Sequence, residues 1–221
     1  MNVIELDWAG IITAVGGLIG AIGGIYSIWA KFHQEEKNKL TDWKLEQYRN
    51  QEKARSYRRA ENTSKVLGAL YQVLLGTGAD RVYIVQPHPL GHIAFLSIQF
   101  EVKVNGVEGM RMHVQRLEMS EVPMFSKMMS EKLFMFFDDI DAQVDDRVAK
   151  SLLSSNGTEA VAVKRLNSSR DWVGSIFCEF MEQPSIPQED IQKAMHEAAV
   201  NIQYILPEYQ EEIDITKNPK M

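Results

Sequence analysis

The sequence predicts an α+β protein in which a single N-terminal transmembrane helix and a long helical stalk precede an antiparallel sheet flanked by helices. Three observations support this fold class. An uncharged apolar run extends from Trp8 to Ala30, and a charged stretch without glycine or proline follows it. Beyond that stretch, apolar and polar residues alternate as they do in half-buried strands. We therefore expect four parts: a tail and transmembrane helix (1–32), a stalk (33–59), a globular domain (60–206) and a C-terminal tail (207–221).

The apolar run has the length of a membrane span. A helix rises about 1.5 Å per residue, so roughly 23 residues cover about 34 Å, against a hydrocarbon core of about 30 Å. The acidic Glu5 and Asp7 precede the run, which is also longer than the apolar part of a signal peptide. Lysines follow it, beginning with Lys31 and Lys37, so the positive-inside rule places the domain in the cytoplasm. We expect a single-pass protein of a bacterial inner membrane or of a phage.

Small residues recur along the predicted span. Gly16, Gly20 and Gly24 stand four residues apart and share one helix face. In lipid, such a face lets two helix backbones approach closely. The spacing therefore predicts a homo-oligomer that forms through the transmembrane helix and the stalk, with the lipid bilayer as a further partner.

Composition excludes several classes of function. The net charge of −6 and the pI near 5.4 argue against general nucleic-acid binding. The single cysteine, Cys178, excludes an internal disulfide and a multi-cysteine metal site. Because its neighbours in the sequence are apolar, we expect a buried, inert thiol rather than a nucleophile.

The stretch from Phe32 to about Leu75 favours one long helix, since it is rich in Glu, Lys, Gln, Arg and Ala. Apolar residues in its first part are sparse and only loosely spaced, which predicts an exposed stalk or a weak parallel coiled coil. From Ala60 to Leu75 they form a continuous apolar face, where we expect the helix to join the domain. The apolar residues of the stalk are Leu40, Trp43, Leu45, Tyr48, Ala54 and Tyr57.

The domain sequence predicts a mixed succession of strands and helices. We expect a short strand at 81–86 that ends at a Pro-His-Pro turn. A second strand is expected at 93–104, with one face formed by Ala94, Leu96, Ile98, Phe100, Val102 and Val104. Asn105-Gly106 predicts a tight hairpin into a strand at 110–119. Helices are expected at 122–135, within 139–155 and at 187–206, and a last hairpin is expected at 159–166 and 172–181.

Three phrases in this succession resemble the GAF family, a sensory fold related to PAS domains. "GADRVYIVQPHP" (78–89) is similar to the first strand of the family, and "SEVPMFSKMMSEKLFMFFDDID" (120–141) to its proline-bearing helix and the strand that follows. "AVAVKRLNSSRDWVGSIFCEF" (160–180) resembles its final hairpin. The likeness covers about residues 60–206 and implies a sensory or ligand-binding module.

Departures from the family pattern limit the ligand. Members that bind cyclic nucleotides carry an Asn-Lys pair before a Phe-x-x-x-Asp-Glu motif; Phe134, Asp138 and Asp139 approximate the second part, and no Asn-Lys pair precedes them. Bilin-binding relatives need a cysteine attachment site, and Cys178 lies in the final strand. We therefore expect no cofactor.

The resemblance places a ligand between one sheet face and the segment 122–141. Polar contacts would come from Tyr83, Arg116, Asp139 and Trp172, and apolar walls from Phe95, Phe125 and Phe137. The alternative is that methionines fill this space as adaptable core side chains. These methionines are Met110, Met112, Met119, Met124, Met128 and Met129.

No catalytic or metal-binding motif stands out. The five histidines form no HExxH motif, and the acidic residues near Asp138 lack the spacing of a calcium loop. We predict no metal site and no enzymatic activity.

Two hypotheses follow. The first is a membrane-anchored, self-associating sensory or protein-interaction module. The second is a membrane-active oligomer, a holin-like, virion or defence-effector protein whose domain controls assembly of a pore or ring. Because the chain stops at Met221 without an output domain, we expect the output to be a separate partner or the membrane segment.

Overall fold

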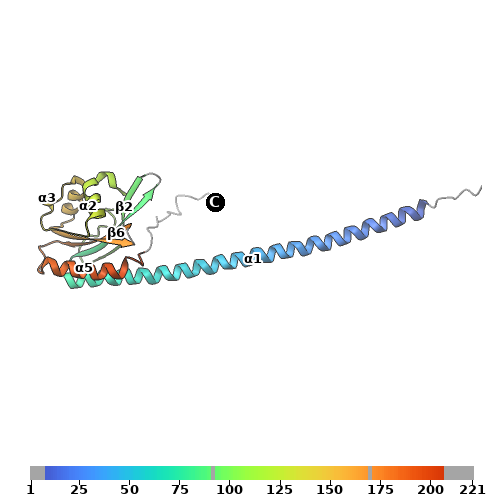
Figure 1. Cartoon of the computed structure of the whole chain (residues 1–221), viewed down its shortest axis with the longest axis horizontal. Coiled ribbons are helices and arrows are strands. Elements are labelled where there is room, and N and C mark those ends of the chain that lie inside the picture. The colour runs from blue at the N-terminus through green and yellow to red at the C-terminus, as the bar shows by residue number, and fades with distance from the viewer. Residues whose placement is uncertain (1–7, 91–92, 169–170, 207–221) are drawn as a thin grey trace, which may run out of the picture. The chain divides into compact units, whose positions relative to one another are not determined.

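A computed structural model describes residues 8–90, 93–168 and 171–206 (Figure 1). The chain divides into two compact units, Met1–Tyr57 and Arg58–Met221. Helix α1 (Trp8–Thr77) supplies the described part of the first unit and the beginning of the second. The long helix that the sequence predicts from Phe32 to about Leu75 is therefore confirmed as part of α1.

The predicted membrane span stays a prediction. The part of the chain that the structure describes holds no helix of the length and apolar character needed to cross a membrane. Within the predicted span, exposure is described only for Gly24 and Trp29, and both residues are exposed. The surroundings of Gly16 and Gly20 lie outside what the structure describes, so the glycine pattern is not tested either.

The second unit contains one six-stranded antiparallel sheet with the order β3-β2-β1-β6-β5-β4. Strands β1 and β6 occupy its centre. Both are rich in β-branched and aromatic residues, which favour strands. The bounds are β1 (Arg81–Leu90), β2 (Ile93–Lys103), β3 (Leu117–Glu118), β4 (Phe134–Phe137), β5 (Ala160–Ser168) and β6 (Asp171–Phe180).

Helices cover both faces of the sheet (Figure 1). The end of α1 and α5 (Gln188–Ile202) pack on one face, where Leu70, Val82 and Ile191 belong to one buried cluster. On the other face, Phe125, Leu153 and Phe177 belong to a second buried cluster. The elements that cover this second face are η1 (Met119–Glu121), α2 (Pro123–Glu131), α3 (Ile140–Gln143) and α4 (Arg147–Ser155).

The apolar face predicted for the end of α1 is confirmed only in part. Val66, Leu70 and Leu74 are buried against the sheet, whereas Tyr71 and Leu75 are exposed. The latter two lie at about 100° and 140° around the helix from Leu70, given 100° per residue. They therefore fall outside the buried stripe.

Strand β2 corrects the prediction of a single apolar face. Ile84 pairs with Phe100 and the next residue, Val85, pairs with Ile98, so Gln99 is an extra residue in a β-bulge. A bulge shifts the alternation by one residue. Phe100 and Val102 therefore face α1 and α5, whereas Leu96 and Ile98 face α2 and α4.

The prediction that β1 ends at the Pro-His-Pro sequence was wrong. It pairs with β2 through Leu90, but with β6 only from Arg81 to Val85. Beyond Val85, β1 is therefore an edge strand on that side. Prolines are tolerated on an edge, because no neighbouring strand needs their missing N–H group.

The prediction of a hairpin at Asn105-Gly106 was wrong. A turn forms there, with Gly106 at a φ of 90°, but it leads into a run of turns that ends in the two-residue β3. The helix predicted at 122–135 begins at Pro123 and ends at Glu131, and β4 follows it. The last hairpin and α5 agree with the prediction.

Candidate functional site

An apolar cavity of about 40 Å³ lies on the sheet face that α2 and α4 cover. Tyr83 and Phe177 form its floor, with their rings stacked at 5.1 Å between centroids. Its remaining walls are Val85, Leu96, Met110, Val114, Leu117, Val122, Phe125, Met129, Ala149, Leu152 and Leu153.

The cavity is too small for an ordinary metabolite. Ligand pockets usually measure about 300 to 1,000 Å³, whereas a single water needs about 10 to 15 Å³. Met110, Phe125 and Met129 are buried and take up space between sheet and helices. The space in which the family resemblance places a ligand is therefore largely filled by the protein's own side chains.

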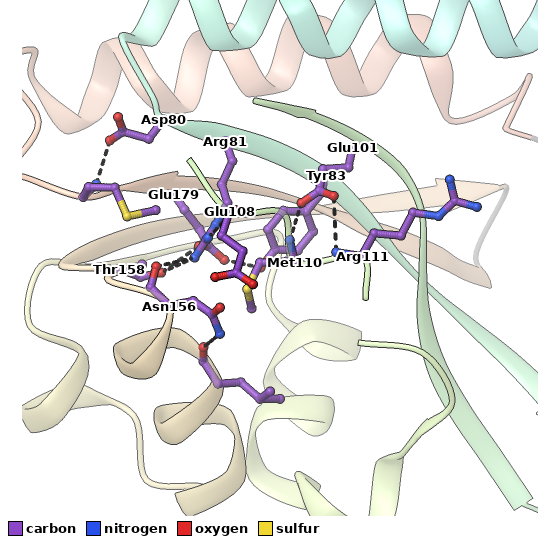
Figure 2. Close-up of polar contacts among 12 residues, drawn as sticks. Asp80, Arg81, Tyr83, Glu101, Glu108, Met110, Arg111, Asn156, Thr158 and Glu179 are labelled. Atoms are coloured by element: carbon purple, nitrogen blue, oxygen red, sulfur yellow. Dashed lines mark hydrogen bonds and ion pairs between the residues drawn. The ribbon is translucent and has the colours of Figure 1, made fainter. Parts of the chain in front are cut away.

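The loop that carries Met110 is tied to the sheet by one carboxylate. Glu101 of β2 accepts hydrogen bonds from the backbone N–H groups of Met110 and Arg111 (Figure 2). A side chain at Gly109 would bring its Cβ within 2.7 Å of the Glu101 carboxylate oxygen. The glycine and the carboxylate together hold Met110 against the cavity.

A buried ion pair lies beside the cavity. The Arg81 guanidinium and the Glu179 carboxylate are opposite each other on β1 and β6, approach to 2.5 Å and are both fully buried. Figure 2 shows both side chains, with that of Thr158, directed toward one another. The Thr158 hydroxyl donates to Glu179 Oε2 at 2.7 Å.

The remaining donors of Arg81 also find acceptors. Its Nη1 donates to the carbonyl oxygen of Glu108 at 2.9 Å, and its Nη2 donates to Thr158 Oγ1 at 2.8 Å and to the carbonyl oxygen of Asn156 at 3.3 Å. Buried charges are tolerated when they are paired and hydrogen-bonded in this way. The pair thus joins two sheet strands to the loops on either side.

Tyr83 connects the ion pair to the cavity. Its ring lines the cavity, and its hydroxyl donates a hydrogen bond to Glu179 Oε1. Burial, followed by the nearby Glu179 carboxylate, raises the pKa of Tyr83 well above 10.0. The tyrosine is therefore a neutral hydrogen-bond donor, and it offers the cavity its ring rather than a reactive phenolate.

The structure brings together three of the seven predicted ligand-binding residues. Tyr83 and Phe125 line the cavity, and the ring centroid of Phe137 lies 5.9 Å from that of Phe125. The other four do not line the cavity. Phe95 of β2 stacks on His88 of β1 with ring centroids 5.9 Å apart. Trp172 is partly buried against the same cluster, and its Nε1 donates to Ser175 Oγ at 3.1 Å.

Arg116 and Asp139 are exposed. Asp139 is the N-cap of α3, where its Oδ1 accepts from the backbone N–H of Ala142 at 2.9 Å. Arg116 has a left-handed backbone with a φ of 56°, and its N–H donates to Ser97 Oγ at 2.9 Å. Neither residue lines the cavity.

The methionine alternative is also confirmed only in part. Met110 and Met129 fill space at the cavity, and Met119 and Met128 are half-buried against the same cluster. Met112 and Met124 are exposed. The pattern of apolar residues in the sequence did not predict that these two side chains face away from the core.

Sequence reasoning missed Arg81, Glu179 and Thr158. A signal was present: Arg81 directly precedes the apolar run 82–85 of β1, and Glu179 interrupts the apolar run 176–180 of β6. Their direct pairing depends on the register of β1 against β6, which the sequence did not supply.

Cys178 lies on the opposite face of the sheet from the cavity. It is fully buried among residues that face α1 and α5, and its sulfur lies 3.5 Å from Thr77 Oγ1. Burial raises its pKa to about 12. The thiol is therefore neutral at physiological pH, in keeping with the inert cysteine expected from the sequence.

An open, acidic depression of about 460 Å³ lies between α3, α4 and the start of β5, and Asp138, Asp139 and Asp141 are among its residues. The described residues contain no group of three or more His, Cys, Asp or Glu side chains placed to hold a metal ion.

Comparison with known proteins defines the fold. No family model matches the chain, and no curated protein matches it. Among solved structures, the blue-light-absorbing form of the Thermosynechococcus elongatus PixJ GAF domain is 12% identical, with a TM-score of 0.53 over 67% of this chain and 86% of that one. The photoproduct state of GAF3 from Slr1393 of Synechocystis is 11% identical, with a TM-score of 0.54 over 64% and 90%.

These identities are far too low to transfer a ligand or an activity, but the likeness extends over most of each solved domain. It agrees with the resemblance found in the sequence at residues 60–206. The globular unit of this chain has a GAF-like α+β fold.

Proposed function

We propose that this protein is a membrane-anchored, self-associating GAF-like module that acts through contact with other proteins and catalyses no reaction. The GAF-like fold supports a sensory or ligand-binding module. The choice of protein contact over a small-molecule ligand rests on one observation, the cavity of about 40 Å³ beside Met110 and Met129.

The size of the cavity favours protein contact for an energetic reason. A ligand of ordinary size would have to displace Met110 or Met129, and burial of one such side chain contributes roughly 1.5 to 3 kcal/mol. The domain is thus folded around its own side chains, without a requirement for a ligand. We therefore place the recognition of other proteins on the surface of the domain.

A thermal-shift screen of the full chain in detergent tests this proposal. A ligand at a hundred times its dissociation constant would add about 2.7 kcal/mol to the free energy of unfolding. We expect nucleotides, cyclic nucleotides and common metabolites to leave the transition unchanged. A reproducible, saturable rise with any of them would make the domain a small-molecule sensor.

The variant Met129→Ala is a positive control for this screen. Removal of a buried methionine enlarges an apolar cavity, and cavities of about 150 Å³ lined by apolar side chains bind benzene. We expect benzene to raise the melting temperature of Met129→Ala but not that of the wild type. The assay would thereby be shown to detect occupation of this site.

Anchoring through residues 8–30, with the domain in the cytoplasm, is the second part of the proposal. It is supported by the uncharged sequence from Trp8 to Ala30 and by the lysines that follow it. Sodium carbonate should leave the wild type in the membrane pellet. Arginines at Ile19 and Ile22 should release it, because each costs about 2.5 to 3.5 kcal/mol at the centre of a span. Release of the wild type itself would contradict the anchor.

A membrane-active oligomer is the second candidate function, and the repeat of Gly16, Gly20 and Gly24 favours it. It differs from the first in one measurable respect. Liposomes that contain the purified chain would release an entrapped dye if the spans assembled into a pore, whereas an interaction module would leave them sealed.

A further inference from the structure

Exposed aromatic residues recur at a fixed interval along α1. Trp29, Trp43 and Tyr57 are spaced by fourteen residues, and their exposed fractions are 59%, 58% and 77%. Tyr71 stands another fourteen residues along the sequence and is 50% exposed on the globular unit. Large aromatic side chains gain most from burial, so a regular series of exposed ones indicates an interaction surface.

The interval has a specific meaning for a helix. Fourteen residues are two heptads, and a straight helix drifts by about 20° per heptad from a 3.5-residue repeat. Positions fourteen apart therefore lie on one slowly winding stripe, and a left-handed supercoil turns this stripe into a straight seam. The positions between Trp43 and Tyr57 that complete the seam at spacings of four and three are Gln47, Asn50 and Ala54.

These five residues, from Trp43 to Tyr57, form what we call the aromatic stripe. All of them are exposed, as is every residue from 42 to 61. An isolated helix gains its stability mainly from packing of one face, so an exposed stretch of this length calls for a neighbour.

We propose that the aromatic stripe binds a second copy of this chain in a parallel, in-register coiled coil. This inference rests on the proposed self-association and names its surface and its register. A second copy presents the same residue at each level, so Trp43 meets Trp43 and Tyr57 meets Tyr57. A slip by one heptad would set Trp43 against the amide of Asn50, which the aromatic contact disfavours.

Charges that flank the stripe set its strength. In a parallel pair, Lys39 of one copy faces Lys44 of the other on each side of the seam, since these residues occupy the flanking heptad positions. Like charges repel, and salt screens exposed charges. The contact is therefore weak at low ionic strength and tightens as salt is added, which is the reverse of an interface held by attractive ion pairs.

Cysteine cross-linking of the full chain in its membrane tests the proposal. The native Cys178 is fully buried, so it contributes little background. Single cysteines are introduced on the stripe by Gln47→Cys and Ala54→Cys, and off the stripe by Glu52→Cys. Under a copper–phenanthroline oxidant, both stripe variants should form disulfide-linked dimers severalfold faster than Glu52→Cys, because a disulfide needs Cα atoms about 4.4 to 6.8 Å apart.

The two stripe positions also report direction. They lie about 10 Å apart along the helix, so both can pair with themselves only if the two helices are parallel. Equal rates at all three positions, or self-pairing at only one stripe position, would overturn the proposal. Added salt, from about 0.05 M to about 0.5 M, should raise the rate at both stripe positions, and a fall would contradict the assigned register.

Aromatic variants show whether the stripe itself drives association. In the Ala54→Cys background, Trp43→Ala with Tyr57→Ala should lower the yield of linked dimer severalfold. Tyr48→Ala is the matched control, since Tyr48 is an exposed aromatic residue on the same helix but off the stripe. An equal loss with Tyr48→Ala would overturn the role of the stripe.

The outcome separates this inference from the proposed function. If the chain stays in the carbonate pellet without stripe-specific links, the stripe is refuted and the anchor stands. If carbonate releases the chain and the links persist, the anchor is refuted and the stripe stands.

Discussion

At the residue scale, the globular unit contains one ion pair, Arg81 with Glu179, whose two side chains are both described as fully buried. The carboxylate also accepts hydrogen bonds from Tyr83 and Thr158. The desolvation of such a pair is offset only while both partners are present. Loss of one partner is therefore more harmful than replacement of both.

We predict that Arg81→Met lowers the free energy of unfolding by about 3 to 5 kcal/mol, because it leaves the Glu179 carboxylate buried without a cation. Arg81→Met with Glu179→Leu should recover much of that loss. Urea denaturation measures both. Lys65→Ala is the control, since it removes only the exposed Glu61–Lys65 pair, and exposed ion pairs contribute little to stability. A loss of similar size in Arg81→Met and Lys65→Ala would refute the account of the pair.

Cys178 gives a prediction for alkaline pH. Burial raises the pKa of its thiol from 9.0 to about 12. Between these values the unfolded chain loses a proton that the folded chain keeps, so the contribution to stability is complete below pH 9 and is lost as pH rises to 12. The loss reaches about 1.4 kcal/mol per pH unit at most.

Urea denaturation from pH 8 to pH 11 measures this effect. Tyr83, whose pKa is also raised, adds a loss of the same sign above pH 10. In Cys178→Ala the fall between pH 9 and pH 10 should be smaller than in the wild type. An identical pH dependence in the two proteins would show that the thiol ionises as freely in the folded state as in the unfolded one.

At the scale of elements, the end of α1 shows how position decides the effect of one substitution. Gly76 lies inside the helix, whereas Gly78 follows it with a φ of 69° and donates its N–H to the carbonyl of Leu74 at 3.1 Å. A Cβ at either position meets no atom within 4 Å. The difference between them is therefore purely one of backbone conformation.

We predict that Gly76→Ala raises the free energy of unfolding by up to about 1 kcal/mol, the difference in helix propensity. Gly78→Ala should lower it by about 1 to 2 kcal/mol, since alanine disfavours the left-handed region. Thermal melts of the two variants provide matched controls for each other. Shifts of the same sign would contradict the assigned end of α1.

Elements with one uninterrupted period were predictable from the sequence. The last hairpin keeps a strand period up to a register shift between Leu166 and Asn167, and α5 keeps a helix period; both elements are confirmed. The faces of β2 were not predictable, because the bulge at Gln99 is set by pairing with β1 and leaves no mark in the alternation. The Asn-Gly hairpin failed because a local turn does not determine which segment pairs next.

The candidate site was predictable only as a region. Tyr83 and Phe125 line the cavity and Phe137 lies against Phe125, because strand parity and one apolar helix face determine where these side chains point. Arg116 and Asp139 are exposed. The sequence did not predict their positions, because these depend on the course of loops. The volume of the cavity depends on the rotamers of Met110 and Met129, which no sequence pattern encodes.

At the scale of the whole molecule, the proposed anchor and the aromatic stripe lie on one helix by sequence. We predict that Gly20→Leu with Gly24→Leu weakens self-association in detergent, because close approach of helix backbones in lipid requires small residues. Sedimentation equilibrium measures the mass of the complex. Ile22→Leu is the control, since it keeps the side-chain volume, and an unchanged mass in the glycine variant would remove the transmembrane part of the proposed interface.

Native mass spectrometry of the full chain, released gently from detergent, tests the central claim that the GAF-like domain works without a bound small molecule. The account predicts a mass that equals 25.2 kDa for each chain in the complex, with nothing retained beyond detergent and lipid. An additional small mass, present once per chain and lost on denaturation or in a variant that fills the cavity, such as Ala149→Leu, would contradict it.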